Sequence, residues 1–178
     1  MDTSYQDWLN LQTAKDERWD IYDANRNLTG KTHRRADPLP AGCYHLVVIA
    51  CVINSKNQFL ITKRAPNKGY AGMWEFPGGS AVTGDDSLTA AIREAEEEAG
   101  LVLLPQNGQL AYTTMRRDAF FDVWLFRQDF RIEDIVLQPG ETVDAQYATA
   151  DEIRILVKEG KFAPSPFVEE LLAFTNQY

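Results

Sequence analysis

Four charged residues that crowd into little more than one helical turn carry the clearest chemical signal in the sequence: Arg93, Glu94, Glu97 and Glu98. On a helix over residues 87–99, at about 100° per residue, the three glutamates stand at i, i+3 and i+4 and share one face. Two carboxylates about 5 Å apart repel by roughly 3 kcal/mol at an effective dielectric constant near 20. Where water is limited, this face therefore needs a cation or a proton. The alternative is an ordinary solvated acidic face with no ligand.

Oxygen ligands of this kind favour Mg²⁺ or Mn²⁺ over zinc, and the sequence offers no Cys/His set at zinc-binding spacing. Mg²⁺ commonly joins a few carboxylates to the phosphates of a substrate, while a further carboxylate activates water. Arg93, four residues before Glu97, can pair with a carboxylate and orient it. The cluster therefore indicates phosphate chemistry.

The helix that carries the cluster must also pack on the rest of the protein. Leu88, Ile92, Ala95 and Ala99 form an apolar stripe suited to a core. The small residues at 90 and 91 are predicted to lie beneath the carboxylates, where they would let a ligand approach closely.

Strands are predicted before and after this helix, together with further helices. The run 44–53 is almost continuously apolar, which is typical of a central strand buried on both faces. Residues 1–17 are interpreted as a short helix or a loose arm. The other expected strands are 19–22 and 28–34 (a hairpin), 58–64, 102–104, 110–116, 119–126 and 143–148, and the other expected helices are 151–158 and 165–174. This order predicts a single domain over 1–178 with a mixed sheet between helices.

Composition narrows the class of protein. The chain has 178 residues, is 44% hydrophobic and 25% charged, and carries a net charge of −8, which disfavours nucleic acid polymers as partners. No apolar stretch approaches the length of a membrane span, and the N-terminal residues lack the features of a signal peptide. Of the two cysteines, Cys51 lies in an apolar run and is predicted to be buried and unpaired. We therefore expect a cytoplasmic protein.

The run Gly79-x5-Asp85-x7-Arg93-Glu94-Ala95-x-Glu97-Glu98-x-Gly100-Leu101 closely resembles the Nudix box. The preceding sequence GMWEFPGG, residues 72–79, resembles the loop that leads into the box in MutT-type members. Asp85 stands where the pattern has Glu, so its role is the least secure in the box. The box spans 78–101, the resemblance covers residues 44–175, and residues 1–42 form an N-terminal extension with the predicted hairpin.

This resemblance implies an α/β/α sandwich and the metal-dependent cleavage of a nucleoside diphosphate linked to another moiety, X. It further implies that Glu94, Glu97 and Glu98 bind Mg²⁺ or Mn²⁺, unless one of them, such as Glu94, is the base for the attacking water. Gly79 would supply a backbone carbonyl, and Arg93 would orient the glutamates. Members often add an acidic residue from outside the box, for which Glu141 is the first candidate, with Asp118 or Asp122 behind it. Each of these three also fits an ordinary solvated loop acid.

Candidate substrate-binding residues are two arginines and two aromatic residues. Arg64, at the end of a predicted strand, and Arg34, in the densest basic cluster, could meet phosphates, although isolated basic residues are commonly surface groups. Trp74 and Phe76 could stack on a base, or could equally pack at the edge of the core. The expected partner is a small-molecule diphosphate, with no nucleic acid polymer and no membrane, and a homodimer is left open.

Two rival functions remain. The N-terminal region is similar to that of Nudix proteins related to isopentenyl diphosphate isomerase. Isomerases of that kind carry a catalytic cysteine in the loop before the box, whereas residues 74–79 contain none. A nucleotide sensor without catalysis is the second rival, but such proteins commonly lose the glutamates that this chain keeps.

Overall fold

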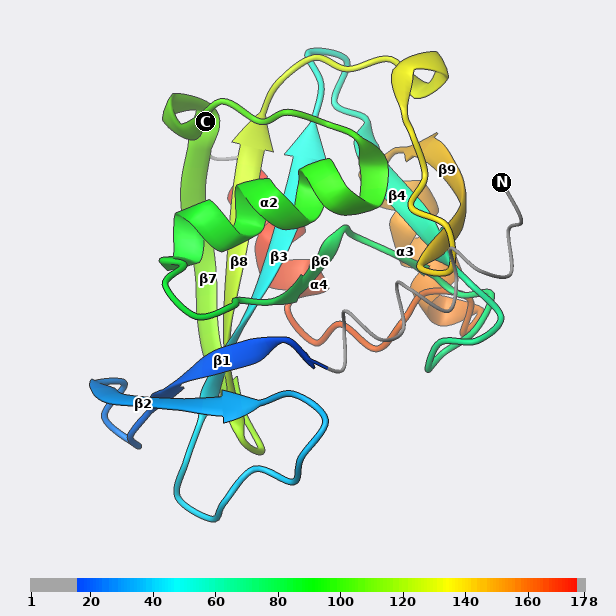
Figure 1. Ribbon diagram of the computed structural model, residues 1–178. Coiled ribbons are helices and arrows are strands. Elements are labelled where there is room, and N and C mark those ends of the chain that lie inside the picture. The colour runs from blue at the N-terminus through cyan, green and yellow to red at the C-terminus, as the bar shows by residue number, and fades with distance from the viewer. Residues whose placement is uncertain (1–15, 176–178) are drawn as a thin grey trace.

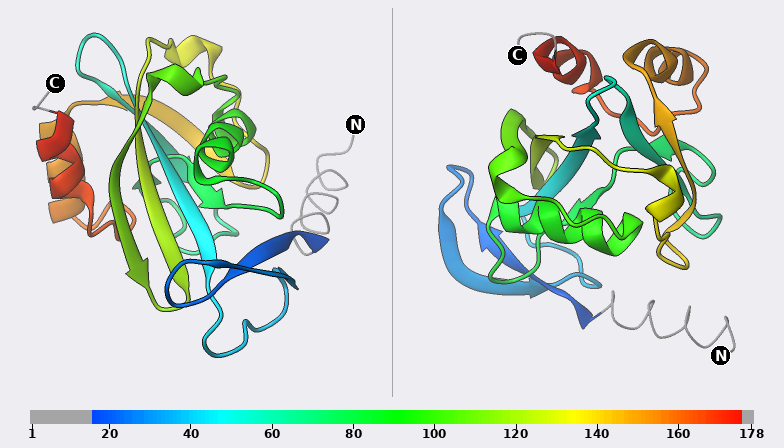
Figure 2. Two further views of the ribbon diagram at one scale, coloured as in Figure 1. Left: turned by 90° about the vertical axis from the view of Figure 1, so that its left-hand side faces the viewer. Right: turned by 90° about the horizontal axis from the view of Figure 1, so that it is seen from above.

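A seven-stranded mixed sheet lies between helix α2 on one face and helices α3 and α4 on the other, as the computed structural model shows for residues 16–175 (Figures 1 and 2). Its central strands, β3 (His45–Ile53) and β8 (Ala119–Arg127), run parallel, with Val47 opposite Phe121 and Ala50 opposite Trp124. The remaining strands are β4 (Phe59–Arg64), β5 (Trp74–Glu75), β6 (Gly78–Ser80), β7 (Gly108–Arg116) and β9 (Thr142–Ala148). The predicted α/β/α sandwich is confirmed.

Helix α2 (Ser87–Ala99) covers one face of this sheet. Asp86 caps its N-terminus by accepting a hydrogen bond from the Thr89 backbone, and Gly100 ends it in the left-handed conformation with φ 64°. Its fully buried alanines pack with the even-numbered residues of β3, including Val48. Ala90 and Ala91 belong to that core, which corrects the prediction that they lie below a ligand.

The opposite face of the sheet is covered by α3 (Ala150–Lys158) and α4 (Val168–Thr175). Ile153, Leu171 and Leu172 pack there against Cys51 and Ile53 of β3. Cys51 is fully buried and free, as predicted. No helix in the described part of the chain is long and apolar enough to cross a membrane.

Strands β1 (Arg18–Tyr22) and β2 (Leu28–Arg34) form a separate antiparallel hairpin beside one end of the sheet (Figure 1). Tyr22 and Tyr44 exchange backbone hydrogen bonds of 2.8 and 3.0 Å, which join the hairpin to the start of β3. The hairpin turn is anchored by Arg26, whose Nη1 donates to Asp122 at 2.9 Å. Asp122 is fully buried and also accepts from the hydroxyls of Ser87 and Thr113. This network fixes the hairpin against both the sheet and the start of α2.

Three local predictions differ from the structure. Residues 102–104 form no strand, because Val102 and Leu104 point to solvent and the Leu104 N–H donates to the Gln128 side chain instead of a neighbouring strand. Residues 78–80, expected in a loop, form β6 on β3. Helix α4 begins at Val168 rather than 165, since residues 161–163 are extended alongside Trp74 and a turn, closed by Val168 N donating to the Ser165 carbonyl, precedes the helix.

Candidate active site

Two glycines of β6 let α2 approach the sheet very closely. A Cβ added to Gly78 would meet the Val48 carbonyl oxygen at 2.4 Å, and one added to Gly79 would meet Glu94 Oε2 at 2.6 Å. Only glycine leaves that space, so the β6 backbone and the acidic face of α2 form one surface.

The two inner carboxylates of α2 are buried. Glu98 is 7% exposed and accepts a 3.2 Å hydrogen bond from the Gly78 backbone, and no lysine or arginine among residues 16–175 pairs with it. Burial, reinforced by Glu75 and Glu94, raises its pKa well above the ordinary value. Burial also raises the pKa of Glu94 to about 7, against the opposing charge of Arg93. Both groups would be stabilised by a cation.

Arg93 holds the cluster in place. Its Nη1 donates to Glu94 Oε1 at 3.0 Å and to Glu97 Oε2 at 2.9 Å, and its Nη2 donates to the Ser80 carbonyl at 3.1 Å. Its Nε donates to Asp85 Oδ2 at 3.0 Å, so the shorter acid at this position still contacts the arginine. The guanidinium therefore cross-links α2, β6 and the loop between them.

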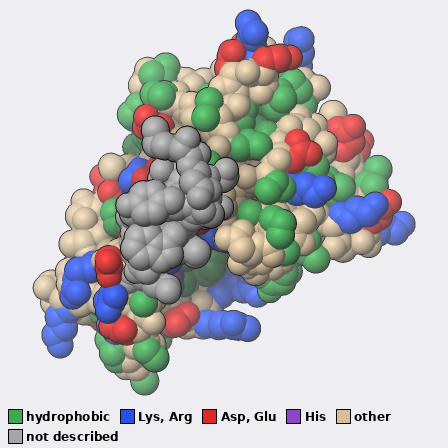
Figure 3. Space-filling model, turned by 45° about the vertical axis from the view of Figure 1, so that its right-hand side comes forward, with side chains coloured by type: hydrophobic (Ala, Val, Ile, Leu, Met, Phe, Trp, Pro, Cys, Tyr) green, Lys and Arg blue, Asp and Glu red, His purple; other side chains and the backbone are tan. Residues whose placement is uncertain are grey.

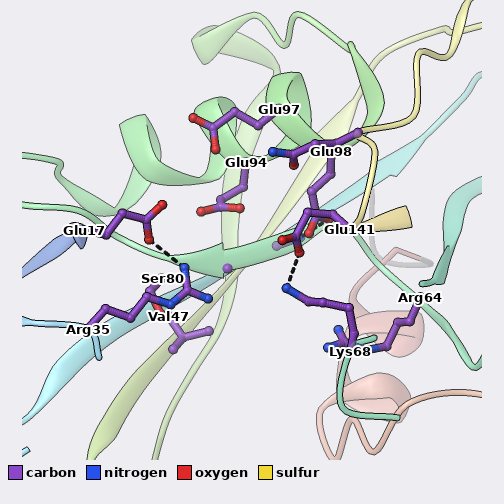
Figure 4. Close-up of a pocket in the computed structure, with 13 residues that line it drawn as sticks. Glu17, Arg35, Val47, Arg64, Lys68, Ser80, Glu94, Glu97, Glu98 and Glu141 are labelled. Carbon is purple, nitrogen blue, oxygen red and sulfur yellow. Dashed lines mark hydrogen bonds and ion pairs between the residues drawn. The ribbon is translucent and has the colours of Figure 1, made fainter. Parts of the chain in front are cut away.

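The carboxylates face a cavity of about 410 Å³ (Figure 4). Glu141 enters it from the loop before β9 and pairs with Lys68, while Arg64 pairs with Glu75. The lining residues are Glu17, Arg35, Val47, Arg64, Lys68, Gly78, Gly79, Ser80, Glu94, Glu97, Glu98, Gln138 and Glu141.

The structure thus brings six of the candidate residues to one cavity, namely Gly79, Glu94, Glu97, Glu98, Glu141 and Arg64, with Arg93 behind them. Arg34 instead pairs with Asp16 at 2.8 Å. Phe76 packs on Phe59 and Phe162 in the core, and the half-buried Trp74 stacks under Lys63. None of these three lines the cavity.

The second-choice acids lie elsewhere as well. Asp122 forms an ion pair with Arg26, and Asp118 lies in the exposed β7–β8 turn. Conversely, the cavity is also lined by four residues that the sequence patterns do not indicate: Glu17, Arg35, Lys68 and Gln138. The N-terminal hairpin and two long loops bring these residues to the cavity. Of the four, only Arg35 belongs to a recognisable sequence pattern, the basic cluster around Arg34.

The side chains present fit a hard divalent cation in type. The possible ligands are all oxygens, and the glycine backbone leaves space that a Cβ would fill. Glu98 is a buried acid that no Lys or Arg of the described residues pairs with. Within residues 16–175, no group of three or more Asp, Glu, His or Cys side chains is already gathered tightly enough to enclose a metal ion. Lys68 and Arg93 instead neutralise Glu141, Glu94 and Glu97.

Acidic and basic side chains are interspersed on the face of the molecule shown in Figure 3. The described residues form no broad basic patch on that face, and the net charge of −8 also disfavours a long polyanion. A small ligand in the cavity suits these charges better than a long polyanion.

Comparison with known proteins agrees with the fold. Residues 44–171 match the NUDIX domain family. An uncharacterized Nudix hydrolase of Listeria monocytogenes is 36% identical over 162 residues, covering 90% of this chain and 96% of its own. The 8-oxo-dGTP diphosphatase of Escherichia coli is 34% identical over 64 residues, 36% of this chain and 48% of that protein.

A crystal structure from Deinococcus radiodurans shares the fold, with a TM-score of 0.69 at 21% identity over 86% of this chain and 96% of that one. The chain belongs to the Nudix family. It is an enzyme of the Nudix hydrolase class.

Proposed function

We propose that this Nudix hydrolase cleaves the diphosphate linkage of a nucleoside diphosphate joined to another moiety, with Mg²⁺ or Mn²⁺ as cofactor. The observation that carries the proposal is the convergence of Glu94, Glu97, Glu98 and Glu141 on one cavity, with Glu98 buried and no cationic side chain in the described part of the chain paired with it. The Escherichia coli relative, a nucleotide diphosphatase by name, supports a nucleotide substrate.

Glu97, Glu98 and Glu141, with the Gly79 carbonyl, are the groups that would hold the metal, joined by Glu94 unless Glu94 is the base. When bound, a divalent cation neutralises charge on the phosphoryl oxygens. Arg93 keeps Glu94 and Glu97 oriented toward the cavity, and a carboxylate, for which Glu94 remains the first candidate, accepts the proton of the attacking water.

A neighbouring cavity of about 220 Å³ suits the organic part of the substrate. Ile49, Phe121 and Phe167 give it apolar walls, and Thr114 and Arg116 give it polar ones. Arg64 lines both cavities, so a substrate with its diphosphate beside the carboxylates can extend past Arg64 into this second space.

The proposal is tested by incubating the protein with nucleoside triphosphates, ADP-ribose, dinucleoside polyphosphates and isoprenoid diphosphates, with Mg²⁺, Mn²⁺ or EDTA. We expect cleavage between phosphates of at least one nucleotide, abolished by EDTA. Cleavage that persists in EDTA would refute the metal assignment, and no cleavage of any nucleotide would refute the substrate class.

The isomerase alternative gains no support from the cysteines. Cys43 is half-buried before β3 and Cys51 is fully buried, and neither lines the cavity. If the protein converted isopentenyl diphosphate into its allylic isomer in the same substrate screen, the isomerase function would replace the proposed hydrolase function. Tight nucleotide binding without turnover would favour the sensor alternative.

A further inference from the structure

The N-terminal hairpin delivers an arginine to the catalytic cavity. Arg35 directly follows β2, and its backbone N–H donates to the Glu17 carbonyl at 2.9 Å. Two bonds of 2.8 Å tie the hairpin to the loop before α2, from Thr83 N to the Arg18 carbonyl and from Gly84 N to Asp20 Oδ2. These bonds therefore fix the position of Arg35 relative to helix α2.

The side chain of Arg35 lies on the cavity wall together with that of Glu17 (Figure 4). Its Nη1 donates to Glu17 Oε2 at 2.6 Å, and the arginine side chain is 37% exposed. Glu94, Glu97 and Glu98 line the same cavity. The ion pair thus borders the box carboxylates instead of lying on a remote surface.

Among residues 16–175, the cations that line the cavity, Arg35, Arg64 and Lys68, differ in how many hydrogen bonds and ion pairs they already form. Arg64 bonds both Glu75 and the Gly69 carbonyl, and Lys68 pairs with Glu141. Within residues 16–175, Glu17 is the one side chain with which the guanidinium of Arg35 forms a hydrogen bond or ion pair, through Nη1. Since a guanidinium has five donors, it can bind a second anion without leaving Glu17.

Arg35 and Lys68 lie at positions in the cavity that suit the two ends of a diphosphate. In Figure 4, Arg35 lies beside Glu17 on the Glu94 side of the cavity, whereas Lys68 lies beneath Glu98 and Glu141. A diphosphate brought to five lining carboxylates (Glu17, Glu94, Glu97, Glu98 and Glu141) needs positive charge at both ends.

We propose that Arg35 is a substrate-binding residue that donates to a phosphate on the hairpin side of the cavity, with Glu17 as its positioning residue. This inference rests on the proposed function. It makes the N-terminal hairpin a part of the substrate site.

Methylenediphosphonate, a diphosphate whose bridge cannot be hydrolysed, is the probe for this contact. Its binding to the full chain in Mg²⁺ is measured by titration calorimetry for the wild type, Arg35→Gln, Arg35→Lys and the matched control Arg34→Gln. We expect Arg35→Gln to weaken binding about tenfold or more and Arg35→Lys to weaken it less. Arg34→Gln is expected to stay within about twofold of the wild type, since Arg34 does not line the cavity. Direct Mn²⁺ binding without the probe should be unchanged in all variants.

Equal probe binding by the wild type and Arg35→Gln would overturn the assignment of Arg35 and leave the proposed function intact. A wild type that neither binds the probe nor cleaves any diphosphate would overturn both. Circular dichroism and the melting temperature establish that each variant is folded. If Arg35→Gln does not fold, two other variants test the inference. It is overturned if Arg35→Lys binds the probe with the affinity of the wild type and Glu17→Gln has an unchanged KM.

Discussion

The carboxylate of Glu94 lies against the backbone of Gly79, where an added Cβ would come within 2.6 Å of Oε2. This contact explains why a glycine of β6 and a glutamate of α2, far apart in the sequence, belong to one site. It also leads directly to a test.

Gly79→Ala should displace Glu94 and lower kcat about 100-fold, because small misplacements of reacting groups have effects of that size. Gly69→Ala is the control, since a Cβ there meets nothing within 4 Å and the backbone has ordinary φ. Steady-state rates of the two variants check the prediction. Equal rates would mean that the Glu94 position is not critical.

The sequence predicted that the box carboxylates lie together, but it did not predict which residues surround them. The i, i+3, i+4 spacing placed Glu94, Glu97 and Glu98 together because helical periodicity is local. It did not reveal that Glu94 and Glu98 are buried beside Ala91 and Ala95, which depends on the glycines of β6. The contributions of Glu17, Arg35 and Lys68 depend on how the hairpin and the loops dock, and no local pattern encodes that. For the same reason, the basic cluster in the sequence does not distinguish Arg35 from its neighbour Arg34.

Asp85→Glu restores the commoner box residue and should change kcat less than about threefold, because either acid can accept from Arg93 Nε. Asp85→Ala should cost about tenfold, since it removes a charged partner of Arg93. Comparison of the two rates checks the role of Asp85. A variant Asp85→Ala with full activity would show that Arg93 is held sufficiently by its other contacts.

Stability of the metal-free protein should fall as pH rises from about 4.5 to about 7. Burial raises the folded-state pKa of Glu94 from 4.5 to about 7, so in this window the folded protein binds more protons than the unfolded chain. Glu94 thus contributes a loss of roughly 3 kcal/mol across the window. Urea unfolding in EDTA should show a flatter pH dependence for Glu94→Gln than for wild type or Glu96→Gln, whose side chain is exposed. Identical pH profiles would contradict the burial of a protonated Glu94.

Asp122→Ala should lower the free energy of unfolding by about 3 kcal/mol, because it leaves Arg26 without its buried partner. Asp118→Ala, in the exposed turn, should change it by less than about 0.5 kcal/mol. Denaturant titration measures both, and Mn²⁺ binding by the folded Asp122→Ala protein should match the wild type. Loss of Mn²⁺ binding in the folded variant would instead make Asp122 a metal ligand.

We propose that the buried carboxylate of Glu98 binds the metal and does not stabilise the fold. The most direct test of this claim is the Mg²⁺-dependent cleavage rate of Glu98→Gln against that of Glu96→Gln, with a nucleotide that the wild type cleaves. We predict a loss of about 100-fold or more for Glu98→Gln and none for Glu96→Gln, with no decrease in the melting temperature of either metal-free variant. Full Mg²⁺-dependent activity of Glu98→Gln would contradict the claim, and so would its unfolding.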